Sequence, residues 1–245
     1  LADIAEPLSR VDAGIAAILF AHTAALEILR LAADENPQTG NDVYQQITNE
    51  TECLLAFPAY ASPHDNITLL VSGDDCRLTG HVPFLVLGGI ARHAIVPART
   101  SASGWDYFLV DLKQPEVVRS APILTLGLHA AQAIDVDLNN VPAIRLGAKI
   151  TVESGTRLYR RMCDSLAIVQ MAMARGLMEG AFKTACEYAS QRIQGGRTIA
   201  DWPAVRMKLA EMGVALGVAQ HCLQGSMTAA LAHDSEFATG ALATA

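Results

Sequence analysis

The stretch YASQRIQGGR, residues 188–197, follows one long helical pattern and precedes a second that opens near residues 201–203. It places an arginine, a glutamine and two adjacent glycines at the end of a helix, where the backbone must bend. A guanidinium group held outward at such a bend suits an anion such as a diphosphate, because its planar fork matches phosphate oxygens. The same residue types are also typical of a glycine helix cap with solvated charges, so both interpretations stay open.

Composition limits the function classes. The chain has 245 residues, 51% of them apolar and only 5% aromatic, which indicates a core of aliphatic side chains and favours closely packed helices. The net charge of -7 argues against a general nucleic-acid binder, since duplex affinity depends on Lys and Arg. Five cysteines without a C-x-x-C motif indicate reduced thiols and a cytoplasmic location. The seven histidines show no metal-ligand spacing, so we predict no metal site.

The most apolar window, Gly14–Ala33, could be mistaken for a membrane helix. It contains His22, Glu27 and Arg30, and charged side chains are costly inside a bilayer. We therefore predict a packed helix and no membrane span, with His22 as a core or interface residue.

Hydrophobic periodicity divides the chain into three parts. Apolar residues spaced by three or four predict helix over about 2–33, with a short helix at 42–47. Short alternating runs separated by turn residues then predict strands at 54–60, 67–71, 77–79, 84–87, 94–98, 107–112 and 133–138. No helical pattern separates these strands, which indicates an antiparallel sheet close to a barrel. Helical periodicity returns near 151.

The predicted fold class is α+β. We expect the end of an N-terminal helical domain at 1–52, a middle β domain at 53–150, and an incomplete, up-down C-terminal helical bundle at 151–245.

Motifs in this order resemble the acyl-CoA dehydrogenase family. They are RLTG at 77–80, FLVLGGIA at 84–91, VPART at 96–100, DVDLNNVP at 135–142, YA at 188–189 with Arg192, Gln194 and Gly196, and LAEM at 209–212. The resemblance implies FAD bound between the middle domain and a neighbour's bundle, and desaturation of an acyl-CoA thioester. It also implies a dimer or tetramer of homologous subunits and an electron-transfer flavoprotein as acceptor.

Several positions depart from the family pattern where this chain would hold its own flavin. The flavin-stacking Trp becomes Phe84, and the flavin-bonding Thr becomes Val86. In the first flavin loop Pro58 replaces a Thr and His64 replaces a Ser. At the opening stretch, a Phe that packs against a neighbour's flavin becomes Gly195.

Other positions keep the pattern. Arg192 and Gln194, which serve a partner's flavin in the family, are retained, and so is Asp164 near the CoA arm. The resemblance therefore assigns Arg192, Gln194, Phe84 and Val86 to cofactor binding, and Asp164 and His64 to substrate binding. It assigns no catalytic residue, because the family's catalytic carboxylate would follow Ala245.

The chain thus keeps the residues that serve a partner's flavin and loses those that would hold its own. In this it resembles the non-catalytic subunit of a heteromeric acyl-CoA dehydrogenase, with FAD held mainly by the partner. Three alternatives stay open. One is a flavin-free acyl-CoA lyase or hydratase, with His64 as the first acid/base candidate. The second is a structural paralogue, and the third an ordinary homomeric dehydrogenase with unusual contacts.

Overall fold

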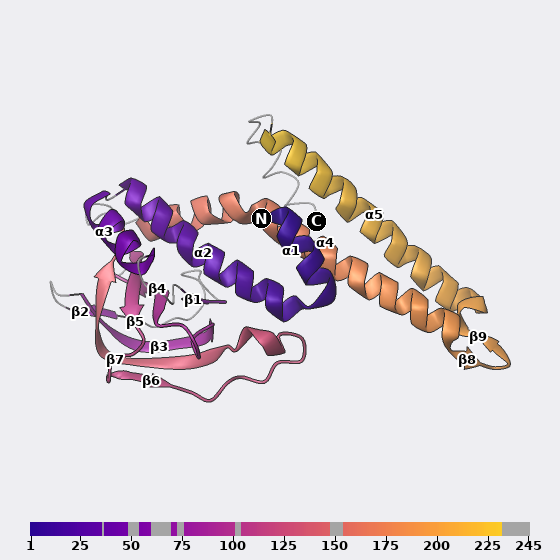
Figure 1. Cartoon of the computed structure of the whole chain (residues 1–245), viewed down its shortest axis with the longest axis horizontal. Helices are drawn as coiled ribbons and strands as arrows, with labels where there is room; N and C mark the ends of the chain where they lie inside the picture. Colours follow the sequence, from indigo (N-terminus) through magenta and orange to yellow (C-terminus); the bar gives the residue numbers. More distant parts are fainter. Residues whose placement is uncertain are drawn as a thin grey trace. The chain divides into compact units, whose positions relative to one another are not determined.

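The computed structural model falls into two compact units, Leu1–Ala16 with Leu166–Ala245, and Ala17–Ser165 (Figure 1). The residues described are 1–35, 37–48, 54–59, 70–72, 76–100, 104–147 and 154–231. The expected domain boundaries at residues 52 and 150 stay a prediction.

A seven-stranded sheet forms the centre of the unit that spans residues 17–165. Its strands are β1 (Leu55–Pro58), β2 (Leu70–Ser72), β3 (Arg77–Val86), β4 (His93–Arg99), β5 (Trp105–Asp111), β6 (Val117–Arg119) and β7 (Ile134–Arg145). Strand β3 pairs with β1 and β7, β7 pairs with β5, β5 pairs with β4, and β4 pairs with β1. These pairings close a ring, which confirms the predicted barrel. Most are antiparallel as expected, but β1 and β2 each run parallel to β4.

Strand β3 is one strand where the sequence predicts two. The register with β7 shifts between Leu78 and Gly80 and again between Val82 and Leu85. Gly80 and Phe84 have positive φ angles of 144° and 48°. Such bulges break the alternation of buried and exposed side chains, so the sequence shows two short runs. Strand β6 was not predicted, because it has three residues and two of them are exposed.

The helices differ from the sequence prediction at their junctions. A single N-terminal helix was expected, but Asp12 separates α1 (Ala2–Val11) from α2 (Ala13–Glu35). The amide of Gly14 donates to Asp12 Oδ1 at 2.7 Å, so Asp12 caps the start of α2. Helix α3 (Pro37–Thr48) includes the predicted 42–47 segment and begins at a proline, as first helical turns tolerate.

Helix α2 is long and apolar enough to cross a membrane by length and composition alone. It buries Ala24, Ile28 and Leu31, and it carries charged side chains near its end. These features are also those of a core helix. The absence of a membrane span therefore stays a prediction.

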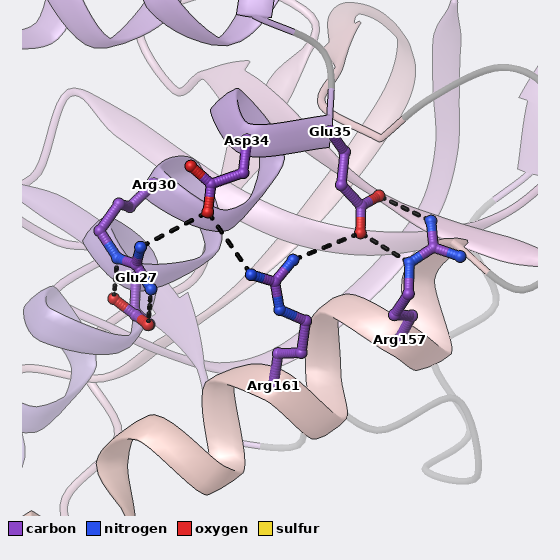
Figure 2. A network of polar contacts seen from close by, with 6 residues as sticks. All are labelled: Glu27, Arg30, Asp34, Glu35, Arg157 and Arg161. Carbon is purple, nitrogen blue, oxygen red and sulfur yellow. Dashed lines mark hydrogen bonds and ion pairs between the residues drawn. The ribbon is translucent and has the colours of Figure 1, made fainter. Parts of the chain in front are cut away.

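Alternating charges connect the end of α2 to the start of α4 (Ser154–Gln191) (Figure 2). Six side chains take part: Glu27, Arg30, Asp34, Arg161, Glu35 and Arg157. Arg161 contacts both Asp34 and Glu35, at 3.4 and 3.8 Å. Arg157 holds Glu35 with two hydrogen bonds, of 2.6 and 2.8 Å, so the two helices are tied by shared, paired charges.

A buried ion pair lies inside the barrel unit. Asp106 on β5 is fully buried and accepts a 2.8 Å hydrogen bond from Arg145 Nε on β7. The backbone amide of Tyr107 donates to the same carboxylate. Burial raises the pKa of Asp106, while the hydrogen bond and charge of Arg145 oppose that rise. The carboxylate therefore depends on Arg145 for its counter-charge.

The other unit contains α1, most of α4, and α5 (Pro203–Leu231). Helices α4 and α5 are antiparallel neighbours that bury Met171, Ala172 and Leu223 between them (Figure 1). The up-down arrangement expected for residues 151–245 is therefore present in the described helices.

Helix α1 packs very closely on α4. A Cβ atom added at Gly176 would come within 3.0 Å of the Glu6 carbonyl oxygen, and one at Gly180 within 3.0 Å of the Arg10 carbonyl oxygen. Two glycines spaced by four therefore let the backbones of the two helices approach. Arg175 also forms an ion pair with Glu6.

Candidate cofactor-contact site

Residues 193–198, at the end of the stretch YASQRIQGGR, form a β-hairpin. Helix α4 ends at Gln191, and β8 (Ile193–Gln194) then pairs with β9 (Arg197–Thr198). Gly195 and Gly196 form the turn, with φ angles of +66° and +81°. Positive φ at both central residues is what the type I′ turn of a two-residue hairpin requires, and glycine meets it without strain. The helix-cap interpretation is therefore wrong for these glycines.

Arg192 and Gln194 lie at the start of this hairpin. Both residues are exposed. The backbone amide of Arg192 donates a hydrogen bond of 2.9 Å to the carbonyl oxygen of Tyr188, in the last turn of α4. Its carbonyl accepts the amide of Ile199 at 2.8 Å, which closes the base of the hairpin. A guanidinium group and a carboxamide thus project from a short, hydrogen-bonded scaffold.

Two further residues contact this hairpin and were not among the predicted site residues. The Arg197 guanidinium carbon lies 3.8 Å from the ring centroid of Trp202, and Trp202 Nε1 donates to the Gln194 carbonyl at 3.2 Å. The sequence signal was weak, because an Arg and a Trp five positions apart around a short 3-10 turn have no fixed spacing rule.

The predicted cofactor residues Phe84 and Val86 lie at the end of β3. The Phe84 amide donates to Asp135 Oδ1 at 2.8 Å, and its carbonyl accepts from the Ala59 amide at 3.1 Å. The side chain of Val86 is buried, and the residue pairs with Phe57. Neither side chain offers a hydrogen-bonding group, so this end of β3 presents only apolar side-chain surface.

The predicted substrate residues are less well defined. Asp164 is exposed on α4, beside Cys163, whose thiol pKa is raised by burial. His64 lies outside the described residues. Phe84, Val86 and Asp164 belong to the unit of residues 17–165, and Arg192 and Gln194 belong to the other unit.

His22 is the described histidine with the clearest structural role. Its Nδ1 accepts the amide hydrogen of Leu55, the first residue of β1, at 3.2 Å. This bond needs an unprotonated Nδ1, and burial lowers the pKa of His22. A neutral imidazole therefore joins α2 to β1.

We expect His22 to lower the free energy of unfolding at acidic pH. Because its pKa is lower in the folded state, the unfolded chain takes up this proton first as pH falls below about 6.5. The contribution is complete above that pH and is lost progressively below it. Urea unfolding at several pH values should show a shallower acid loss in His22→Gln than in wild type. Equal slopes in the two proteins would contradict this role.

The fold defines the chain as an α+β protein with a closed barrel and an antiparallel helix pair. Residues 153–245 match the family model described as acyl-CoA dehydrogenase, C-terminal domain. This is the family that the sequence motifs predicted, and the acyl-CoA dehydrogenase relatives support the same family.

Individual relatives are distant. An acyl-CoA dehydrogenase of Bacillus subtilis is 27% identical over 238 residues, covering 87% of this chain and 59% of that protein. A caffeyl-CoA reductase-Etf complex subunit, CarC, of Acetobacterium woodii is 26% identical over 157 residues, covering 62% and 41%. A solved structure, the FAD complex of PigA, matches with a TM-score of 0.78 at 20% identity, covering 99% of this chain and 66% of that one. The chain thus matches less than two thirds of the length of these curated relatives.

Proposed function

We propose that this chain is a subunit of an FAD-dependent oxidoreductase that desaturates an acyl-CoA thioester between its α and β carbons. In this proposal Arg192 and Gln194 contact an FAD that a homologous partner subunit mainly holds. The observation that carries it is the contrast between two regions. The hairpin presents exposed polar and cationic groups, and the end of β3 presents none.

The hairpin fits the diphosphate of FAD. Arg192 and Arg197 lie within one short segment of a chain whose net charge is -7, so the local charge is opposite to the overall charge. The nearby carboxylate of Asp201 accepts a hydrogen bond from the Thr198 hydroxyl at 2.8 Å and lies 3.6 Å from Arg206. Because Asp201 is paired with Arg206, its charge does not cancel those of Arg192 and Arg197, and the planar guanidinium groups of these two arginines match phosphate oxygens.

The chain's own barrel fits FAD poorly. Val86 is buried and has no hydroxyl group, and Pro58 at the end of β1 has neither a hydroxyl nor an amide hydrogen. Each lost hydrogen bond in a desolvated site costs about 1–3 kcal/mol. Tight FAD binding by this chain's barrel alone is therefore not expected.

FAD, when bound, would supply the acceptor for the hydride leaving the β carbon, and the α proton would go to the carboxylate base of the dehydrogenase. We propose that Asp164 lies near the CoA portion of the substrate and that His64 lies near the acyl-CoA. The proposed partners are a homologous dehydrogenase subunit, in a dimer or tetramer, and an electron-transfer flavoprotein. The name of the Acetobacterium woodii relative, which places that protein in an Etf complex, supports the latter. A cytoplasmic location is part of the same proposal.

The test compares the chain purified alone with the chain co-expressed with acyl-CoA dehydrogenase homologues from neighbouring genes. We expect little flavin absorbance from the chain alone and a flavin spectrum from the complex. Arg192→Gln should lower the FAD content of the complex, whereas Arg206→Gln, on the same unit but paired with Asp201, should not. Tight FAD binding by the isolated chain would contradict the proposal.

The same preparations separate the alternatives. Flavin-independent hydration of an enoyl-CoA that is lost in His64→Ala would favour a lyase or hydratase. Failure of both the chain and the complex to bind acyl-CoA in calorimetry would favour a structural paralogue.

A further inference from the structure

The indole of Trp202 packs against the hairpin turn at Gly195. A Cβ atom added at Gly195 would come within 2.9 Å of Trp202 Cζ2, so the ring occupies the space that a side chain at 195 would need. Among the residues that the structure describes, no atom beyond the neighbouring residues of the turn lies within 4 Å of the corresponding position at Gly196. The ring therefore packs on one side of the turn only.

The same ring holds two different groups. Through its edge, Nε1 donates to the backbone carbonyl of Gln194 at 3.2 Å. Over its face, the Arg197 guanidinium carbon lies 3.8 Å from the ring centroid, well inside the range of a cation–π contact. Gln194 and Arg197 are themselves paired across the two strands.

Strands of two residues cannot hold a turn in one conformation by themselves, since isolated hairpins are marginal in water. The contacts of Trp202 stabilise the hairpin, which its own two strands are too short to do. A side chain other than an aromatic N–H donor could not make both contacts.

We propose that Trp202 is a positioning residue that fixes the hairpin for anion binding, and that Arg197 is a second cationic contact to the diphosphate beside Arg192. The inference rests on the proposed function and deepens it. It gives the site two guanidinium groups on one preorganised turn. When the turn is already ordered, ligand binding does not have to supply the free energy of ordering it, so affinity is higher.

The first measurement needs no cofactor. Amide hydrogen exchange on the chain is compared between wild type, Trp202→Phe and Trp202→Ala. Phenylalanine keeps an aromatic ring for Arg197 but removes the N–H donor together with part of the indole, so it removes less packing than alanine does. We expect exchange at the hairpin amides, including that of Ile199, to be about 3- to 10-fold faster in Trp202→Phe, the factor that one hydrogen bond represents, and faster still in Trp202→Ala.

The second measurement uses the flavin-holding complex, with FAD and riboflavin as probes. Riboflavin lacks the diphosphate. We expect Trp202→Phe to weaken FAD binding about 3- to 10-fold and Arg197→Gln to weaken it about 10-fold, with riboflavin affinity unchanged. Arg206→Gln is the matched control and should bind both probes like wild type.

The outcomes separate the two proposals. Unchanged exchange in both Trp202 variants overturns the positioning role, whatever the affinity for FAD. Faster exchange together with wild-type FAD affinity overturns the link between the position of the hairpin and anion binding. Equal loss of affinity for FAD and for riboflavin indicates general damage to the site and overturns that link too. If Arg192→Gln leaves FAD affinity unchanged, the proposed function fails independently of the exchange result.

Discussion

Replacing Gly176 by alanine is expected to destabilise the unit formed by α1, α4 and α5 by up to about 2 kcal/mol, the overpacking cost less the gain in helix propensity. Glycine to alanine inside a helix normally gains about 1 kcal/mol, so the sign here is reversed. The reason is the Glu6 carbonyl oxygen, which lies within 3.0 Å of the new Cβ position. Because the obstacle is backbone, α1 must move away, and overpacking of this kind costs about 1–3 kcal/mol.

Chemical unfolding should detect the loss, and limited proteolysis should detect earlier cleavage within residues 2–11. Gly217→Ala in α5 is the matched control, since among the described residues no atom outside its own helical segment lies within 4 Å of its added Cβ. We expect that variant to be equal to wild type or up to about 1 kcal/mol more stable. A Gly176→Ala protein that gains stability would show that α1 does not pack on α4 as described.

The second large effect is expected from Arg145→Gln, which should destabilise the barrel unit by about 3–5 kcal/mol. This change leaves the Asp106 carboxylate fully buried without a counter-charge, and unpaired buried charges are costly. The pKa of Asp106 is already raised by burial, and removing Arg145 should raise it further. The deficit should therefore shrink as pH falls and Asp106 takes up a proton.

Urea unfolding at neutral and mildly acidic pH measures both effects. The control is Arg92→Gln, which breaks a more exposed pair with Asp111 at the other end of the same strand. Exposed pairs contribute about 0–1 kcal/mol, so that variant should be near wild type at both pH values. Equal losses in the two variants would contradict the argument from burial.

Sequence patterns predicted the fold class and its long helices, because spacing by three or four is retained along α2, α4 and α5. The sequence patterns failed where a single residue determines where one helix ends and the next begins, or where a strand is interrupted. Asp12 divides the first helix by capping α2, and the bulges at Gly80 and Phe84 hide the continuity of β3. Pairing of β1 and β2 parallel to β4 is a long-range property that local alternation does not encode.

The candidate site was only partly accessible from sequence. Residue types marked Arg192 and Gln194, and the glycine pair could have been read as a hairpin turn. Strands of two residues show no alternation, so the helix-cap interpretation was equally open. The contacts of Trp202 with the Gln194 carbonyl and with Arg197 depend on how the chain folds back after the turn.

The charge network between α2 and α4 gives the protein a particular response to temperature. The cost of removing charged groups from water falls on warming, whereas hydrophobic stabilisation per unit area levels off. Because Glu35 and Glu27 are the least exposed members, their pairs gain most from this change. The junction of these two helices should therefore be among the last parts of the barrel unit to separate on heating, and it should separate sooner in concentrated salt.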